Sequence, residues 1–280
     1  MKKYLLDFLI VVLILGGVGL LLFPVISDHR NRAQASALIV TYNNEIDQKS
    51  EEEKEKMLQD AREHNRVLSG ANIALDGSAI PGYEQLLNVT RTGIMGYLEI
   101  EKIGVQLPIY HGVDSGVLQI GVGHMPNSSL PVGGESSHCV LSSHRGLPTA
   151  KLFTDLDQVV IGDVFTITVA DEMLLYQVDQ IKTVLPEEMR DLAIVPGEDL
   201  CTLVTCTPYG INSHRLLVRG RRVIPSADAP AVVRVANDAI QVEPLVVATI
   251  LAIPTLGLVS LAAFLVSRSK KNREKEEGKA

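Results

Sequence analysis

One cysteine occupies a position typical of a nucleophile. Cys206 ends the apolar, β-branched stretch Cys201–Cys206, and the turn-forming segment Thr207–Gly210 follows at once. A side chain at the end of a strand is held rigidly and stays open to a substrate. We therefore predict that Cys206 is a nucleophile. Cys139 and Cys201 lie earlier in their apolar strands and are predicted to be small buried side chains.

A cysteine attacks as its thiolate, so a base or a cation must lie near it. His144 closes the apolar segment Cys139–Ser143 just before a turn, which is the placement that Cys206 has on its own segment. His144 is therefore the predicted base. Four other histidines carry no such signal and are interpreted as ordinary surface or loop side chains: His29, His64, His111 and His124.

The spacing of these residues predicts how they pair. His144 follows Cys139 by five residues, and Cys206 follows Cys201 by five residues. Side chains alternate along a strand, so each pair points to opposite faces. If the two strands are parallel neighbours, His144 and Cys206 share one face and the two other cysteines share the opposite face. Those two are then buried thiols, with a disulfide as the alternative.

The third candidate is a cation, Arg215. A hairpin-like loop over residues 207–213 is expected to bring Arg215 back beside Cys206. Arginine offers a permanent charge and a fork of donors suited to an oxyanion or a substrate carbonyl, whereas an ordinary surface salt bridge is the alternative. His138 and His144 are about 20 Å apart along a strand, and no CxxC spacing occurs. No metal or cofactor is therefore expected.

The elements around these residues point to a membrane protein. The chain has 280 residues and a formal charge of −7, which excludes a basic nucleic-acid binder. Uncharged apolar runs over Phe8–Ile26 and Leu245–Val266 predict two membrane spans. The first is interpreted as a retained anchor, with a cleaved signal peptide as the alternative. Six cations follow the second run, so both ends are expected to be cytoplasmic and the middle outside.

Residues 28–68 carry apolar side chains at helical spacing and predict a helical stalk. In residues 69–91 the helical period ends and Gly and Pro become frequent, which predicts a lid-like loop. The alternative is a simple connection between the stalk and the β domain. The other predicted divisions are an N-terminal anchor or signal peptide (1–27), a catalytic β domain (92–225), a linker (226–244), a C-terminal span (245–267) and a basic cytoplasmic tail (268–280).

Seven short apolar segments bounded by turn residues predict a mainly β domain, either a barrel or a sandwich. These segments are Tyr97–Ile100, Val105–Tyr110, Cys139–Ser143, Val164–Val169, Leu174–Ile181, Cys201–Cys206 and Leu216–Arg222. Short helices are expected near Gly116–Ile120, Lys151–Leu156 and Pro186–Leu192.

The candidate residues also resemble a known family. The stretch Thr202–Cys206, with Arg215 nine residues later and His144 sixty-two residues before, resembles the signature of sortases. The segments that resemble class C, the pilin-polymerising sortases, are Gly96–Ile100, Leu107–Gly112, His144–Pro148 and Thr205–Asn212. The resemblance covers about residues 30 to 265. It implies the eight-stranded sortase β-barrel with short helices.

The resemblance further implies a cysteine transpeptidase at the cell membrane, with its catalytic domain outside. Cys206 would cut an LPxTG-like sorting signal of a pilin or surface protein between Thr and Gly and keep the Thr carbonyl as a thioester. His144 would act as acid and base, and Arg215 would hold the signal and stabilise the oxyanion. A Lys amine of the next pilin would resolve the intermediate. The alternatives are attachment of proteins to the cell wall, or a tethered adhesive or scaffold domain without enzymatic activity.

One departure from class C concerns the lid. Members usually carry Asp-Pro-aromatic before a Tyr-x-x-Leu-Leu-Asn segment; here that segment is Tyr83–Asn88, and the motif position reads Asp76, Gly77, Ser78. Asp76 is a candidate partner of Arg215, yet no aromatic ring follows it. We therefore expect a loosely held lid.

Overall fold

The computed structural model describes residues 2–70, 82–89, 92–224 and 257, with side chains from Val12 onward. Residues Ile26–Ala229 form one compact unit, which holds the barrel, α2 and the part of α1 from Ile26 onward. The predicted C-terminal span and tail fall outside the described residues.

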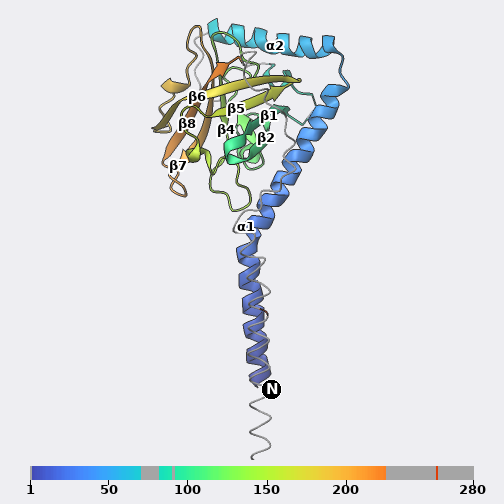
Figure 1. The fold of residues 1–280 in the computed structure, drawn as a ribbon, viewed down its shortest axis with the longest axis vertical. Helices are drawn as coiled ribbons and strands as arrows, with labels where there is room; N and C mark the ends of the chain where they lie inside the picture. The colour runs from blue at the N-terminus through green and yellow to red at the C-terminus, as the bar shows by residue number, and fades with distance from the viewer. Residues whose placement is uncertain (1, 71–81, 90–91, 225–256, 258–280) are drawn as a thin grey trace, which may run out of the picture. The chain divides into compact units, whose positions relative to one another are not determined.

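Eight strands close into a barrel in the order β1-β2-β3-β4-β7-β8-β6-β5 (Figure 1). The pairs β2–β3 and β4–β7 are parallel and the other neighbours are antiparallel. The mainly β fold with an eight-stranded barrel is thereby confirmed. The strands are β1 (Ile94–Ile100), β2 (Val105–His111), β3 (Val122–His124), β4 (Ser137–Ser142), β5 (Val164–Val169), β6 (Glu172–Val184), β7 (Asp199–Thr207) and β8 (His214–Val223).

The helices are few and mostly short. Two long helices, α1 (Lys2–Asp47) and α2 (Glu51–Gly70), precede the barrel. The short ones are α3 (Ser115–Leu118) and the 3₁₀ turns η1 (Tyr83–Gln85), η2 (Glu101–Ile103), η3 (Leu156–Gln158) and η4 (Arg190–Leu192). Two of the three predicted short helices coincide with α3 and η4, and the third falls on turns that lead into η3.

Alternation along β4 and β7 sorts their side chains into two sets. Cys139, Leu141, Cys201 and Leu203 belong to the main core that fills the barrel. Their neighbours on the other face join a second apolar cluster with side chains from β6, β8 and η4: Val140, Val184, Leu192, Val204 and Leu217. We call this second set the outer apolar cluster. Cys206 follows Val204 by two residues, so alternation places it on the outer face.

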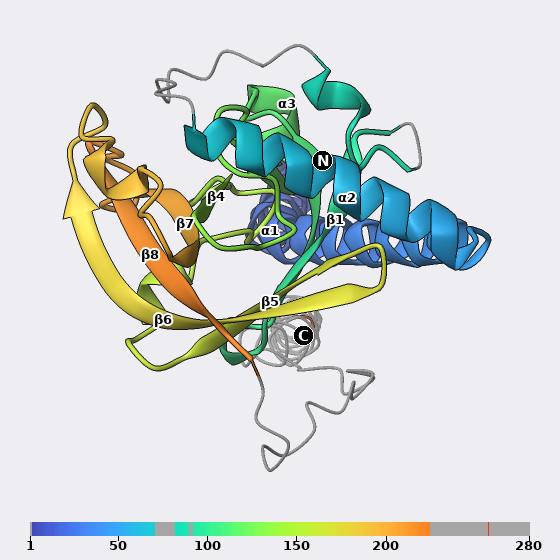
Figure 2. The same cartoon turned by 90° about the horizontal axis from the view of Figure 1, so that it is seen from above.

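Residues 28–68 are helical except for the break at 48–50, but α1 and α2 do not stand free of the barrel. Tyr42, Ile46, Leu58 and Ala61 are buried in the main core. The apolar stripe that predicts an amphipathic helix needs a surface to pack on, and the barrel supplies it. Figures 1 and 2 both show the part of α1 after Val25 on the β1 side of the barrel, and α2 running across one end of the barrel toward β4.

The beginning of α1 contains the first apolar run. From Val12 onward, α1 is long and apolar enough to cross a membrane. It is the one such helix in the part of the chain that the structure describes.

Tyr42 fastens α1 to the barrel, and its hydroxyl is a testable contact. The hydroxyl donates to the Met95 carbonyl at 3.0 Å and accepts from the Ala170 N–H at 2.9 Å. Tyr42→Phe removes the hydroxyl that both backbone groups bond, so we expect the free energy of unfolding to fall by about 1–3 kcal/mol in chemical denaturation. Tyr209→Phe is the control, because its ring is 60% exposed. Equal stability of the two variants would contradict this role.

Candidate active site

The parallel pairing of β4 and β7 confirms the register predicted from the cysteines. Cys139 pairs with Cys201, and the same offset runs along the strands to Ser142 and Val204. Cys139 and Cys201 are free thiols inside the barrel. Burial raises the pKa of the Cys201 thiol well above its usual range, so this thiol stays protonated. Neither residue is placed to meet a substrate.

Two further hydrogen bonds continue the same pairing of residues between the β4 and β7 segments beyond the end of β4. The Ser143 N–H donates to the Val204 carbonyl at 3.2 Å, and the Thr205 hydroxyl donates to the Ser143 carbonyl at 2.9 Å. At the same offset, His144 is level with Cys206. Both side chains are half-buried, which leaves them accessible at the end of the two strands. This side-by-side placement is the one predicted from the sequence.

Arg215 completes the group from the next strand. It pairs directly with Cys206 across β7 and β8, and directly opposed residues in an antiparallel pair share a face. Its Nη1 donates to the carbonyls of Asn212 at 3.3 Å and His214 at 3.2 Å. No carboxylate among the described residues forms an ion pair with it, so the salt-bridge alternative finds no support in residues 12–70, 82–89 and 92–224.

The loop after Cys206 packs against the turn after His144. The Pro208 carbonyl closes this loop by accepting from the N–H groups of Ile211 and Asn212 at 3.1 and 3.0 Å. A Cβ added to Gly146 would lie 3.1 Å from the Tyr209 ring. Gly146 also has φ +77°, which L side chains rarely adopt. Glycine at this position therefore lets the two loops approach each other.

Helix α1 also holds the loop that follows His144. Asp28 of α1 accepts from the Lys151 N–H at 2.6 Å, and the Asn31 amide donates to the Thr149 carbonyl at 3.1 Å. Asp28 and Asn31 come directly after the apolar run of α1. The structure thus ties the first turn beyond that run to the loop of the candidate base.

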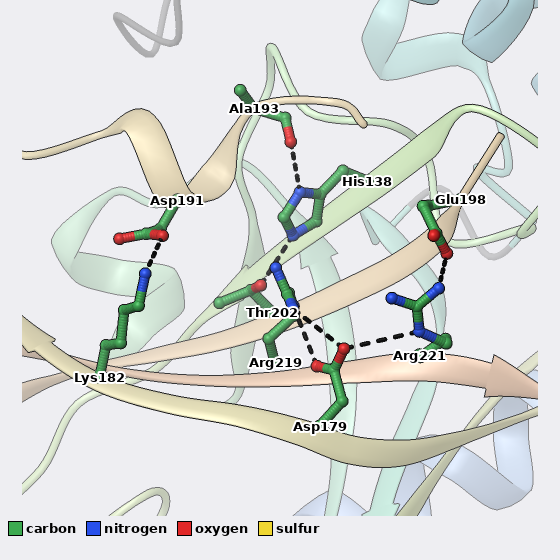
Figure 3. A network of polar contacts seen from close by, with 9 residues as sticks. All are labelled: His138, Asp179, Lys182, Asp191, Ala193, Glu198, Thr202, Arg219 and Arg221. Carbon is green, nitrogen blue, oxygen red and sulfur yellow. Dashed lines mark hydrogen bonds and ion pairs between the residues drawn. The ribbon is translucent and has the colours of Figure 1, made fainter. Parts of the chain in front are cut away.

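A polar network fixes the loop 185–198, which leads into β7 (Figure 3). His138 Nδ1 donates to the Ala193 carbonyl at 2.8 Å, and Nε2 accepts from the Thr202 hydroxyl at 2.7 Å. Figure 3 also shows four ion pairs: Lys182 with Asp191 and Arg221 with Glu198 tie β6 and β8 to this loop, and Asp179 on β6 pairs with both Arg219 and Arg221 on β8. Leu192 in this loop belongs to the outer apolar cluster.

The buried imidazole of His138 predicts a pH dependence of stability. Burial, with some repulsion from Arg219, lowers its pKa below the usual value, although the hydrogen bond to the Ala193 carbonyl and the charge of Asp179 act in the opposite direction. The unfolded chain therefore takes up a proton near pH 6.5 that the folded chain refuses, and stability falls as pH drops below about 6.5. We expect His138→Gln to flatten this fall, measured by urea unfolding between about pH 7 and 5.

The pKa values of His64 and His111 are also lowered by burial, so the variant should reduce the pH dependence without removing it. An unchanged pH dependence in His138→Gln would show that His138 is protonated equally in the folded and unfolded chain.

The interpretation of His124 and His111 as ordinary surface or loop residues is wrong. His124 is fully buried on β3. Its Nε2 donates to the Ser129 carbonyl at 2.9 Å, and its Nδ1 accepts from the Tyr83 hydroxyl at 2.8 Å. His111 ends β2 and contacts the carbonyls of Gly93 and Leu86 through its two ring nitrogens at 2.9 and 2.8 Å. Both histidines fasten the Tyr83–Asn88 segment to the barrel.

The lid candidates Asp76, Gly77 and Ser78 lie outside the described residues. The described chain continues as helix to Gly70 and resumes at Gly82, just before the buried Tyr83.

Comparison with known proteins is consistent with this geometry. Residues 98–223 match the family described as Sortase domain. Sortase C1 from Streptococcus agalactiae is 44% identical with a TM-score of 0.64, over 68% of this chain and 100% of that chain. Sortase C from Streptococcus pneumoniae is 43% identical with a TM-score of 0.62, over 67% of this chain and 97% of that chain. Sortase D of Bacillus subtilis is 30% identical over 131 residues, 46% of this chain and 63% of its own length.

The chain belongs to the sortase family, and the solved relatives confirm its resemblance to class C. Sortases are cysteine transpeptidases, so the candidate residues lie in the barrel of an enzyme family. The match covers less than two thirds of the length of sortase D.

Proposed function

We propose that this protein is a membrane-anchored transpeptidase that cuts an LPxTG-like sorting signal and joins the product to a Lys amine of another pilin subunit. One observation carries the proposal. Cys206 pairs with Arg215 across β7 and β8, and His144 follows the end of β4 at the offset that continues the pairing of β4 with β7. A thiol, an imidazole and a permanent cation at one accessible edge are the groups that acyl transfer requires.

In the first half-reaction, the Cys206 thiolate adds to the carbonyl carbon of the Thr–Gly bond. Negative charge develops on the carbonyl oxygen, and the Arg215 guanidinium stabilises it. When the C–N bond breaks, His144 gives its proton to the leaving Gly amine. The products are a thioester on Cys206, a free Gly amine and a neutral His144.

In the second half-reaction, a Lys ε-amine adds to the thioester carbonyl. His144 takes a proton from the attacking amine, and Arg215 again stabilises the oxyanion. The C–S bond breaks, an isopeptide bond remains on the pilin, and Cys206 is regenerated as its thiolate beside protonated His144. Atoms and charge balance over the cycle without any cofactor.

The outer apolar cluster continues the face of Cys206, but its side chains are already buried, so the support for a substrate comes from the relatives. Val204 lies two residues before Cys206 on the same face, and Val140 and Leu217 flank it from β4 and β8. Sortase C from Streptococcus pneumoniae is described in terms of its pilin substrate specificity, and this likeness favours a pilin as the substrate here.

We also propose that the catalytic domain lies outside the cell membrane. The apolar beginning of α1 supports an anchor. Lys2 and Lys3 precede it, and a basic tail follows the second apolar run, which favours cytoplasmic ends at both termini.

The proposal is tested with full-length protein in detergent micelles, mixed with an LPxTG peptide and analysed by mass spectrometry. We expect an acyl adduct on Cys206 with the mass of the peptide up to Thr. Addition of a Lys-containing pilin peptide should discharge the adduct and give an isopeptide product. A peptide with the same residues in scrambled order is the control.

Other outcomes would favour the alternatives. Discharge by a cell-wall type amine but not by the Lys peptide would indicate attachment to the wall. Absence of any adduct, in protein whose Cys206 still reacts with a small thiol reagent, would favour a tethered scaffold domain.

A further inference from the structure

A second residue pair directly follows the candidate catalytic pair along the two segments. Arg145 follows His144, and Thr207 follows Cys206. The Arg145 Nη1 donates to the Thr207 hydroxyl at 3.4 Å, and these residues have the same offset of 62 as the Thr205–Ser143 bond. The Arg145–Thr207 contact therefore joins the turn after His144 to the end of β7, one residue beyond His144 and Cys206 in both segments.

The environment of Arg145 is unusual for a charged side chain. Its side chain is only 9% exposed, and its Nη2 pairs with Asp157, which is 49% exposed. Its Nε is buried without a hydrogen-bond partner among the described residues. An unpaired buried donor costs about 1–3 kcal/mol. Stability alone is a poor reason to keep an arginine at this position.

The turn that carries His144 has few other ties to β7. The backbone ladder ends at Ser143, and the His144 carbonyl bonds instead to the Phe153 N–H at 3.1 Å. The Gly146 N–H bonds to the Thr154 hydroxyl at 3.2 Å. Both of these bonds stay within the loop after His144. Among the described residues, the one hydrogen bond from this turn to β7 beyond Ser143 is that of Arg145.

We propose that Arg145, held by Asp157 and bonded to Thr207, is a positioning residue that keeps His144 within proton-transfer reach of Cys206. The inference rests on the proposed function, in which His144 serves as acid and base. Proton transfer needs the two heavy atoms about 2.6–3.2 Å apart. A displacement of about 1 Å costs on the order of 100-fold in rate. A guanidinium provides one nitrogen for Asp157 and another for Thr207, which the single ammonium of Lys does not reproduce.

The test compares Arg145→Lys and Thr207→Val with Arg66→Lys, whose exposed side chain pairs only with Glu63 on α2. Activity is measured on full-length protein with the LPxTG peptide. We expect kcat to fall about 10- to 100-fold in Arg145→Lys and less in Thr207→Val, with KM nearly unchanged, because the interaction acts on the chemical step. The melting temperatures should stay within about 4 °C of wild type.

A double variant separates positioning from a direct catalytic or structural role. If Arg145 acts through His144, Arg145→Lys should have no further effect on the residual rate of His144→Ala. An equal fall of kcat in both backgrounds, or an unchanged kcat in Arg145→Lys, would overturn the inference.

A measurement without substrate distinguishes this inference from the proposed function. The rate of Cys206 alkylation is followed against pH, since it reports how the neighbouring imidazole controls the thiolate. Arg145→Lys should move this profile toward that of His144→Ala, even if no sorting signal is accepted. A profile identical to wild type would overturn the positioning role, whereas peptide inactivity of wild type would overturn only the proposed function.

Discussion

Replacing Cys206 with Ala should abolish both cleavage and transfer, and replacing His144 with Ala should nearly abolish them. Without the thiol no thioester forms, so residual turnover should equal the background. Loss of the acid and base should lower kcat by about 10²–10⁴-fold. Both variants should fold normally, because the two side chains are half-buried and lie at the end of the strands, outside both apolar clusters. The measurement is single-turnover release of the peptide that follows the cut.

The other cysteines provide a matched control. Cys139→Ser and Cys201→Ser make a chemically similar change on the opposite face of the same two strands. Both thiols are buried in the main core, so the hydroxyl should lower the free energy of unfolding by about 1–3 kcal/mol. Turnover of the folded fraction should remain close to wild type. If Cys139→Ser removes turnover from protein that is fully folded, the assignment of faces is wrong.

The relation between His144 and Cys206 is predictable from sequence because it depends on local periodicity. His144 follows Cys139 by five positions, and Cys206 follows Cys201 by five positions. Alternation then determines which face of the strand each side chain occupies. The one further assumption is that the two strands are parallel neighbours, which the pairing of Cys139 with Cys201 confirms. The position of Arg215 is predictable for a similar reason, since a short loop returns the chain beside the strand it has just left.

Other features of the fold leave too little signal in the local sequence to be predicted. β3 is only three residues long, so alternation cannot reveal it, and His124 is consequently misinterpreted as a loop residue. The helical period over residues 28–68 is visible in the sequence, but the surface on which this apolar face packs is not. Tyr42 bonds to Met95 and Ala170, which are 53 and 128 positions away, and such distant contacts leave no periodic pattern.

Arg145, inside the candidate site, is another residue whose contacts with distant positions could not be predicted from the sequence. Its partners, Asp157 and Thr207, are 12 and 62 positions away on separate segments. Nothing in the run His144–Pro148 distinguishes this arginine from an ordinary turn residue. The available signal is its position next to the predicted base, which becomes informative only once Thr207 is known to lie opposite.

Arg215→Lys should be severely impaired although the charge is retained. The Arg215 Nη1 already holds the carbonyls of Asn212 and His214, and a guanidinium has further N–H donors for a substrate carbonyl. A Lys ammonium is a point charge and cannot serve both the loop and the substrate in the same geometry. We expect kcat/KM for the LPxTG peptide to fall by about 10²–10³-fold, the usual cost of losing an oxyanion donor. Arg221→Lys is the control, because Arg221 lies on the same strand and pairs with Glu198 and Asp179 instead.

The way the loss divides between kcat and KM decides what Arg215 does. A fall in kcat at constant KM indicates a contact made only in the transition state, as oxyanion stabilisation requires. A rise in KM at constant kcat indicates that the guanidinium mainly holds the sorting signal. If kcat/KM of Arg215→Lys is close to wild type, the bonds to Asn212 and His214 are its main contribution, and Arg215 shapes the loop after Cys206 without touching the substrate.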